Sequence, residues 1–291
     1  LVPLNPDVEV PEAIESMQMI LSPMAIGDNN PDIAVTSASN TTQSENSIFV
    51  NPNDNNKVLS SNNSTNNPVT TVFGTSGFMS SNGAASFSGS IQGTGGGNSG
   101  DPAAVINLAG RYFVGYIAAN GGQGVAYSDN EGTSWTDVQI APNPGSLADK
   151  NHFWVDNSPS SPYQGRLYSA WTDFGGAFDG DVVISRSTNN GTSWTTRQNL
   201  SNSLPGFQQG VHIQTGPNGE VYAFYTNYIS GGVQDEPAYA LSRSFDGGVT
   251  WSTANIITGT RGIRLSTTSK NMRVNSFPVS AVDISGGPNN G

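Results

Sequence analysis

The amino-acid sequence predicts an all-β protein in which a four-stranded sheet is copied around one axis, as in a β-propeller. Composition is the first reason, because 35 Gly and 17 Pro among 291 residues, with only 11% charged residues, favour short strands joined by turns. The second is an aromatic strand that recurs about every 55 residues, and the third is a Trp-ending turn of nearly the same period. A period of about 50–60 residues with four strand-like runs is typical of a propeller blade.

The recurring aromatic strand follows a glycine. Its three copies are Gly110–Tyr116, Gly165–Trp171 and Gly219–Tyr225. A short apolar run precedes each copy, at 103–107, 153–156 and 211–215, and a further run of this kind lies at 279–283. We interpret each pair of runs as the first two strands of one blade.

The recurring turn has the pattern Ser-x-Asn/Asp-x-Gly-x-Ser/Thr-Trp. Its defining residues are Ser128, Asn130, Gly132 and Trp135, then Ser187, Asn189, Gly191 and Trp194, and finally Ser244, Asp246, Gly248 and Trp251. A degenerate copy, Ser80–Phe87, has Ala in place of Gly and Phe in place of Trp. The Asn or Asp side chain can accept hydrogen bonds from nearby amides, and Gly supplies a positive φ. We expect each Trp ring to lie between neighbouring sheets.

These repeats divide the chain into blades at 45–96, 97–144, 145–205 and 206–262, with the start of a fifth at 270–291. Residues 1–44 lack the repeat and are expected to form a lead-in or linker, with a short helix at Pro11–Leu21 or a strand at Asp32–Thr36. A ring must close to remove its open sheet edges. We therefore expect at least four blades here, and a ring that a longer chain or another segment completes.

The charge balance and residue usage exclude several classes of protein. A net charge of −11 repels phosphate backbones, so nucleic-acid partners are not expected. The sequence contains no run of 18 apolar residues, so no membrane-spanning segment is expected. The absence of Cys excludes disulfides, thiolate metal sites and a Cys nucleophile. Because the chain begins with Leu1 rather than Met, we expect it to be processed or trimmed.

Candidate ligand-binding residues lie where the chain leads into the first strand of each blade. These loops are expected to meet at one mouth of the central channel. The polar side chains there are Asp101, Asp149, Lys150, His152, Arg273 and Asn275. They either converge on a ligand or cap strand ends beside a hydrated channel, and both interpretations stay open. His152 and His212 occupy successive units, but two His make a poor metal site, so a structural role is favoured.

No cofactor and no metal are expected from the motifs. The acidic loop Asp173–Asp181 could hold a structural Ca²⁺ or could be a solvated loop. The run Gly93–Gly100 lacks the Lys and the following helix of a phosphate loop and is expected to join two blades. The aromatic residues Phe174, Phe178 and Tyr228 could stack on sugar rings or pack between blades.

The eight-residue turn resembles the Asp-box, or BNR (bacterial neuraminidase) repeat, and the likeness covers about residues 45–291. Only Asp246 keeps the Asp that names the motif, since Asn130 and Asn189 stand there in the other copies. The segments Asp149–Asp156 and Ser276–Asp283 also resemble secreted bacterial proteins of sialidase-like type. The resemblance implies a propeller of four-stranded blades, with Asp-box turns between the outer two strands and away from any catalytic face.

The resemblance also implies what a sialidase would need. Such enzymes use three Arg to bind the substrate carboxylate, a Tyr–Glu nucleophile pair and an Asp acid/base. This sequence lacks the Arg-Ile-Pro segment that opens them. Repeat-equivalent positions hold Arg111, Arg166, Arg186 and Arg243, which predicts structural roles such as an ion pair. A carboxylate clamp could come only from the arginines outside the repeat, Arg261, Arg264 and Arg273, and no catalytic residue is assigned.

The sequence thus favours a secreted or cell-surface propeller within a larger exported bacterial protein, glycan-binding or scaffolding rather than catalytic. One alternative is a sialidase-like glycoside hydrolase or polysaccharide lyase with part of its site beyond residue 291. Another is a passenger, cargo or adhesin domain of an export system. The expected partners are glycans, the remainder of its own chain, or export and surface proteins.

Overall fold

The structure is a computed structural model that describes residues 32–90, 97–228, 236–260, 262 and 275–291. Residues 32–34 belong to an N-terminal unit, 1–34, and every described strand lies in a second unit, 35–291. The helix expected at Pro11–Leu21 lies outside the described residues, and Asp32–Thr36 carry no regular structure. Among the residues that are described, no helix is long and apolar enough to cross a bilayer.

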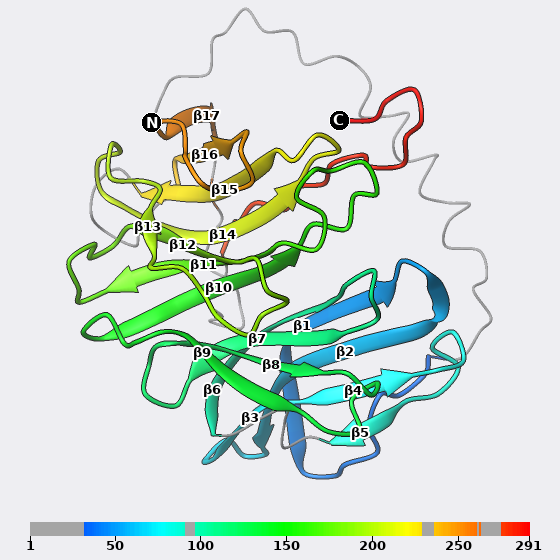
Figure 1. Ribbon diagram of the computed structural model, residues 1–291. Coiled ribbons are helices and arrows are strands. Elements are labelled where there is room, and N and C mark those ends of the chain that lie inside the picture. The colour runs from blue at the N-terminus through cyan, green and yellow to red at the C-terminus, as the bar shows by residue number, and fades with distance from the viewer. Residues whose placement is uncertain (1–31, 91–96, 229–235, 261, 263–274) are drawn as a thin grey trace, which may run out of the picture. The chain divides into compact units, whose positions relative to one another are not determined.

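The second unit contains four antiparallel sheets whose strands pair in chain order (Figure 1). The first sheet consists of β1 (Thr41–Asn51), β2 (Asp54–Asn66), β3 (Val72–Thr75), β4 (Gly77–Ser80) and β5 (Ser88–Ser90). The second consists of β6 (Asn98–Ile106), β7 (Tyr112–Ala118), β8 (Gln123–Ser128) and β9 (Thr136–Ala141). In the first sheet both β3 and β4 pair with β2, so these two short strands together take the place of a third strand.

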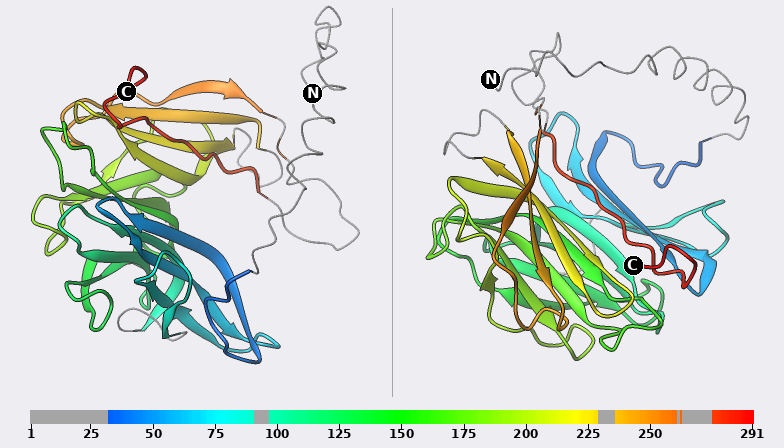
Figure 2. Two further views of the ribbon diagram at one scale, coloured as in Figure 1. Left: turned by 90° about the vertical axis from the view of Figure 1, so that its right-hand side faces the viewer. Right: turned by 90° about the horizontal axis from the view of Figure 1, so that it is seen from above.

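The third sheet consists of β10 (Leu147–Val155), β11 (Leu167–Phe174), β12 (Val182–Ser187) and β13 (Gln198–Asn199). The fourth consists of β14 (Phe207–Thr215), β15 (Val221–Tyr228), β16 (Ala238–Ser244) and β17 (Asn255–Gly259). The first strands lie side by side in the order β1, β6, β10 and β14, and the sheets fan out from them (Figures 1 and 2). Sheets arranged in this way are blades, so the predicted all-β propeller architecture is confirmed.

The hydrophobic core lies between successive sheets, because alternate strand residues face opposite neighbours. One apolar cluster joins the first and second sheets through Leu59 and Ile106. A second cluster joins the second and third sheets, where the rings of Phe113 and Phe153 stack with centroids 5.8 Å apart. A third cluster joins the third and fourth sheets. Each blade is therefore held mainly by its sequence neighbours.

All four repeated turns share one hydrogen-bond pattern. In the copy that begins at Ser187, the Ser Oγ accepts from the N–H of Gly191, and Asn189 Oδ1 accepts from the N–H of Ser193, both at 3.0 Å. The copies at 128–135 and 244–251 repeat these contacts. The degenerate copy does so too, with Ala84 taking the Gly position at φ 66°. The turn thus depends on its Ser and Asn more than on Gly.

Each motif tryptophan packs against the apolar cluster between its own sheet and the preceding one. Trp135, Trp194 and Trp251 are half-buried and lie against the first, second and third inter-sheet clusters respectively. The Trp194 ring meets Phe153 edge to face, with centroids 5.6 Å apart. The three indoles therefore have like surroundings, as expected for copies of one module.

Basic side chains just before the second strands reach forward to the next turn. Lys57 pairs with Glu131 at 2.6 Å, Arg111 donates to the carbonyl of Asn190 at 2.8 Å, and Arg166 donates to the carbonyl of Gly247 at 2.5 Å. Arg186 similarly donates to the carbonyl of Gly248, whereas Arg243 lies over the ring of Phe245. Lys57, Arg111, Arg166 and Arg186 therefore tie one blade to the next at the turn end of the sheets, whereas the contact of Arg243 stays within its own blade.

The segment 275–283 follows the fourth sheet without forming a strand. The ring of Phe277 lies against Gly210, where a Cβ atom would overlap it, and Ser280 contacts His212. Ser276 donates its N–H to the Glu236 carboxylate at 2.9 Å. The segment therefore runs beside β14, the place of the next blade's first strand (Figure 2).

Candidate functional site

The first strand of every described blade contains a β-bulge at an equivalent position. The register shifts between Ser44 and Ser47, Gly100 and Ala103, Asp149 and His152, and Gln209 and His212. One residue in each bulge has a left-handed conformation, with φ of 53° at Glu45, 56° at Asp101, 51° at Lys150 and 70° at Gly210. A non-Gly residue in this left-handed region destabilises the fold by about 1 kcal/mol or more. Three charged residues therefore occupy positions at which Gly would be less strained.

The bulges bring three charged side chains together at the end of the sheets opposite the repeated turns. Lys150 Nζ lies 2.5 Å from Glu45 Oε1 and 3.3 Å from Asp101 Oδ2. The carboxyl groups of Glu45 and Asp101 are close enough to shift each other's pKa. Asn63 of β2 supports both acidic residues, donating to Glu45 Oε2 and accepting from the backbone N–H of Asp101, each at 2.7 Å. We call Glu45, Asp101 and Lys150 the mouth cluster.

Burial and neighbouring charges shift the pKa values of the two carboxyl groups of the mouth cluster in opposite directions. Burial, the hydrogen bond to Glu45 and the charges of Glu45 and Asp149 raise the pKa of Asp101 to about 7, against the opposing charge of Lys150. Burial also acts to raise the pKa of Glu45, but hydrogen bonds with Asp101 and Lys150 outweigh it and lower that pKa. At pH 7 Asp101 is therefore about half protonated while Glu45 is ionised, and the positive charge of Lys150 offsets most of the negative charge of the pair.

A cavity of about 250 Å³ opens beside the mouth cluster. It is lined by Glu45, Asn46, Asp101, Pro102, Lys150, Asn151, Gly210, Val211, His212, Phe277 and Pro278. All four first strands and the segment 275–283 therefore contribute to its wall. Neither polar atom of the Asn151 side-chain amide has a hydrogen-bond partner, although both are shielded from solvent. This amide can offer a ligand one donor group and one acceptor.

The two histidines lie deeper, just after the bulges of β10 and β14. Their rings face each other with centroids 4.3 Å apart. His152 Nδ1 accepts a hydrogen bond from the backbone N–H of Ile213 at 3.2 Å, which joins the third and fourth sheets. Ser47 Oγ accepts one from the N–H of Ala104 at 2.9 Å and joins the first and second sheets in the same way. Burial lowers the pKa of both histidines, and His212 lowers that of His152 further. These neutral rings join neighbouring strands rather than forming a ligand set.

The sequence-predicted candidates are only partly brought together. Asp101 and Lys150 stand at the centre of the site, and Asp149 lies beside it, where its Oδ2 accepts from Gln209 at 2.7 Å. The ring of His152 lies against that of His212. Asn275 is half-buried next to Ser276, and Arg273 lies outside the described residues.

Sequence reasoning missed the residues Glu45, Asn63, Asn151 and Phe277. The strand register shows that Glu45, Asp101, Lys150 and Gly210 occupy equivalent positions, each two residues before the residue at which pairing resumes after the bulge. A charged residue at three of these four positions became a signal only once the bulges were placed. Asn63 gave none, because it acts from the second strand of its blade.

Within the described residues, no arginine lines the mouth cavity. Arg111, Arg166 and Arg186 act at the opposite end, and Arg197 pairs with Asp173 at 2.7 Å. Arg261 and Arg264, like Arg273, lie outside the description. A Tyr–Glu hydrogen bond does exist, from Tyr228 to Glu236 at 3.0 Å, but both side chains are completely buried and Tyr228 stacks on Phe207.

The acidic loop Asp173–Asp181 has its carboxylates engaged by protein groups. Asp173 accepts from Trp171 and Arg197, Asp179 accepts from the N–H of Gly175, and Asp181 accepts from Asn199. In the described part of the chain, no group of three His, Cys, Asp or Glu side chains is arranged to hold a metal ion. Phe178 packs against the second inter-sheet cluster.

Comparison with known proteins supports the fold. No protein-family model and no curated sequence matches the chain. Among solved structures, a protein of unknown function from Dyadobacter fermentans matches with a TM-score of 0.57 and 14% identity, over 79% of this chain and 72% of the other. The leech intramolecular trans-sialidase matches with a TM-score of 0.56 and 11% identity, over 84% of this chain and 56% of the other.

The NanB sialidase of Streptococcus pneumoniae also matches, with a TM-score of 0.53 and 12% identity, over 84% of this chain and 56% of the sialidase. The chain thus spans little more than half the length of these two sialidases. At such low identity the likeness shows that the chain has a sialidase-like β-propeller fold.

Proposed function

We propose that this chain is a glycan-binding propeller module whose ligand sits at the mouth cavity. The mouth cluster carries the proposal, because three charged side chains are kept at strained bulges beside an open cavity. Strained backbone is retained where function requires it and the surrounding fold can hold it. The equivalent positions of a purely structural repeat would be free to become Gly, as at Gly210.

The chemistry of the cavity suits a neutral sugar. Lys150 and the Asn151 amide supply donors, the carboxyl oxygens and the amide supply acceptors, and the Phe277 ring offers an apolar wall. Because Lys150 and the partial protonation of Asp101 offset most of the carboxyl charge, the cluster carries little net charge near pH 7. An acidic sugar would instead meet two carboxyl groups and, among the described residues, no arginine.

The spacing of the carboxyl groups favours binding over hydrolysis. Glycosidases hold two carboxyl groups about 5–5.5 Å apart when they retain configuration and about 6.5–9.5 Å apart when they invert it. Glu45 Oε1 and Asp101 Oδ2 instead share Lys150 Nζ, at 2.5 and 3.3 Å, so an ammonium group is engaged where a glycosidase leaves room for a sugar carbon or a water. Lys150 further holds both groups in place.

A sialidase-like glycosidase or polysaccharide lyase is the second candidate. It is favoured by the pKa of about 7 at Asp101, which suits a general acid, and by the sialidase-like fold. Its remaining catalytic residues would then come from outside the described residues.

A glycan array followed by calorimetric titration tests the proposal. We expect the wild-type chain to bind at least one neutral glycan without turnover. Lys150→Met should weaken that binding about tenfold or more, because it removes a charge-assisted donor. Lys57→Met is the matched control, since Lys57 is also salt-bridged but lies at the turn end, and its affinity should equal that of wild type. Equal affinity in Lys150→Met, or no bound glycan, would contradict the proposal, and turnover would favour the second candidate.

The proposal extends to place and partners. We propose a secreted or cell-surface location, a larger exported protein around this module and no cofactor, as the Asp-box resemblance suggests. A passenger or adhesin role in an export system would instead give protein partners and an array without signal.

A further inference from the structure

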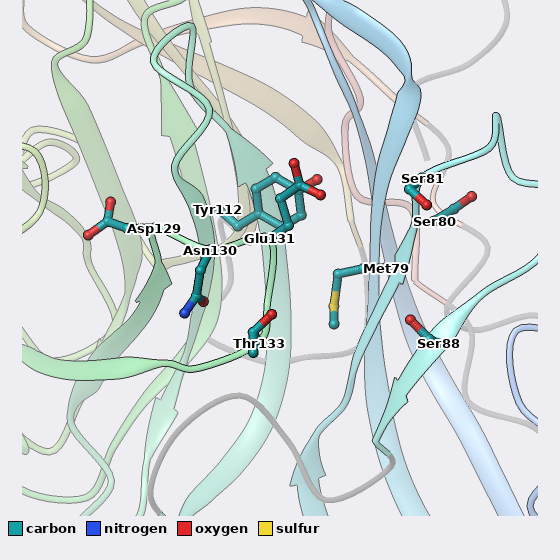
Figure 3. A pocket seen from close by; sticks show the side chains of 9 residues that line it. All are labelled: Met79, Ser80, Ser81, Ser88, Tyr112, Asp129, Asn130, Glu131 and Thr133. Carbon is teal, nitrogen blue, oxygen red and sulfur yellow. The ribbon is translucent and has the colours of Figure 1, made fainter.

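A second cavity, of about 380 Å³, lies between the first two sheets at their turn end (Figure 3). Figure 3 shows its two walls, one from β4, the following turn and β5, and the other from the turn after β8 and the start of β7. It is lined by Met79, Ser80, Ser81, Ser88, Tyr112, Asp129, Asn130, Glu131 and Thr133. We call it the turn cavity, and it shares no lining residue with the mouth cavity.

The turn cavity exists because the first blade departs from the repeat. In the later blades an aromatic ring supports the next turn, and a Cβ on Gly191 or Gly248 would lie 2.9 Å from Phe113 or Tyr168 respectively. The strand register places Leu59 at the equivalent position of the first blade. The atoms nearest to a Cβ on Gly132 belong to Met79, so a thioether rather than an aromatic ring lies under this turn.

Tyr112 is the second departure from the repeat. It pairs with the first Ser of its turn, a position that holds Val58, Leu167 and Val221 in the other blades. The Tyr112 side chain is only 1% exposed, and its hydroxyl group has no hydrogen-bond partner. Burial, together with the charges of Glu131 and Asp54, raises its pKa to about 12, so the hydroxyl remains a donor. An aliphatic residue would serve packing as well, and the unpaired hydroxyl therefore calls for a ligand.

The charges at the rim of the turn cavity cancel in pairs. Glu131 is bound by Lys57 at 2.6 Å, and Asp129 is held by Arg111 through two hydrogen bonds of 2.6 and 2.7 Å. Each carboxylate is thus already committed to a cation. The cavity favours neither an anion nor a metal ion, and its remaining polar groups suit a neutral polar ligand.

We propose that the turn cavity is a second ligand site, which takes one neutral monosaccharide unit. The Tyr112 hydroxyl donates to a sugar oxygen at the floor of the cavity. The hydroxyls of Ser81, Ser88 and Thr133 exchange hydrogen bonds with sugar hydroxyls at the walls, and Met79 lies against the C–H face of the ring. The volume is near the lower limit of small-molecule sites, about 300 Å³, which limits the ligand to one sugar unit.

Amide chemical shifts in solution test this second site. The ¹⁵N-labelled chain is titrated with glucose, galactose, mannose and N-acetylglucosamine at millimolar concentrations. We expect at least one of them to shift the amides of Ser81, Ser88 and Thr133 in a saturable way. Tyr112→Phe should weaken this binding about three- to tenfold, since it removes one hydrogen bond and keeps the ring. Its unfolding temperature should stay at or above that of wild type, because the hydroxyl has no protein partner.

Two matched variants separate this site from a general effect. Tyr116→Phe removes a hydroxyl from the same strand that pairs with Asp137, so it should leave the sugar-induced shifts of Ser81, Ser88 and Thr133 as in wild type. Thr133→Val removes a wall hydroxyl and should weaken binding independently of Tyr112. The proposal is wrong if none of the four sugars gives saturable shifts at this cavity, or if Tyr112→Phe and Thr133→Val both bind with wild-type affinity.

Discussion

Replacing Lys150 with Met removes the ammonium group that contacts both carboxyl groups of the mouth cluster while keeping much of the side-chain volume. At 3.3 Å from Asp101, the Coulomb attraction is about 5 kcal/mol for an effective dielectric of 20 and about 1 kcal/mol for water. The Lys150 and Asp101 side chains are 20% and 14% exposed, so the lower half of that range applies. We expect Lys150→Met to lower the free energy of unfolding by about 2 kcal/mol near pH 8.

Lys150→Met should lower the free energy of unfolding by a smaller amount at acidic pH. Above the Asp101 pKa of about 7 both carboxyls are ionised, and Lys150→Met leaves two negative charges in contact. Near pH 5.5 a proton neutralises Asp101, and only the attraction to Glu45 is lost. Urea unfolding of wild type and variant at both pH values measures the difference, which we expect to shrink by about 1 kcal/mol. An equal loss of unfolding free energy at both pH values would refute the raised pKa of Asp101 in the mouth cluster.

Three further predictions concern the frame that holds the site. Gly210→Ala should lower the free energy of unfolding by about 2 kcal/mol and detach the segment 275–283, because a Cβ at φ 70° would overlap Phe277. An unchanged unfolding temperature would show that the segment does not lie against Gly210. His152 has a folded pKa below its unfolded value of 6.5, so its contribution to stability is present above that pH and lost as the pH falls. His152→Gln should therefore gain stability relative to wild type below about pH 6.5, in urea unfolding at several pH values, whereas a constant difference would argue against a neutral buried ring. Trp194→Ala should lower the free energy of unfolding by about 2–3 kcal/mol, and the same change at Trp135 or Trp251 should have a similar effect. Strongly unequal losses, measured by calorimetry, would contradict the equivalence of the blades.

The repeat architecture could be read from the sequence because its signals are local. The Ser and Asn of each turn bond within eight residues, and the Trp fills the space beside its own turn. The same reasoning recognised the degenerate copy at Ser80–Phe87, whose hydrogen bonds match those of the others. A favoured structural role for His152 also agrees with its hydrogen bond to Ile213.

The mouth cluster was only half predicted because bulges have no local sequence signature here. A bulge changes which face a side chain occupies, and strand alternation alone cannot locate it. Glu45 lies at the first residue assigned to the repeat, so its equivalence to Asp101 and Lys150 was missed. The turn cavity lies where the first blade has Leu59 instead of an aromatic residue. This difference between the blades can be recognised only when their strands are aligned by register.

Mapping a bound glycan by amide shifts tests the central claim most directly. The glycan with the highest affinity on the array is titrated into the ¹⁵N-labelled chain, and the shifted amides are assigned. The account predicts that the largest shifts fall on the bulges of the first strands, at Glu45, Asp101, Lys150 and Asn151, and on Phe277. Shifts confined to the repeated turns or the outer strands, with these five amides unmoved, would contradict it.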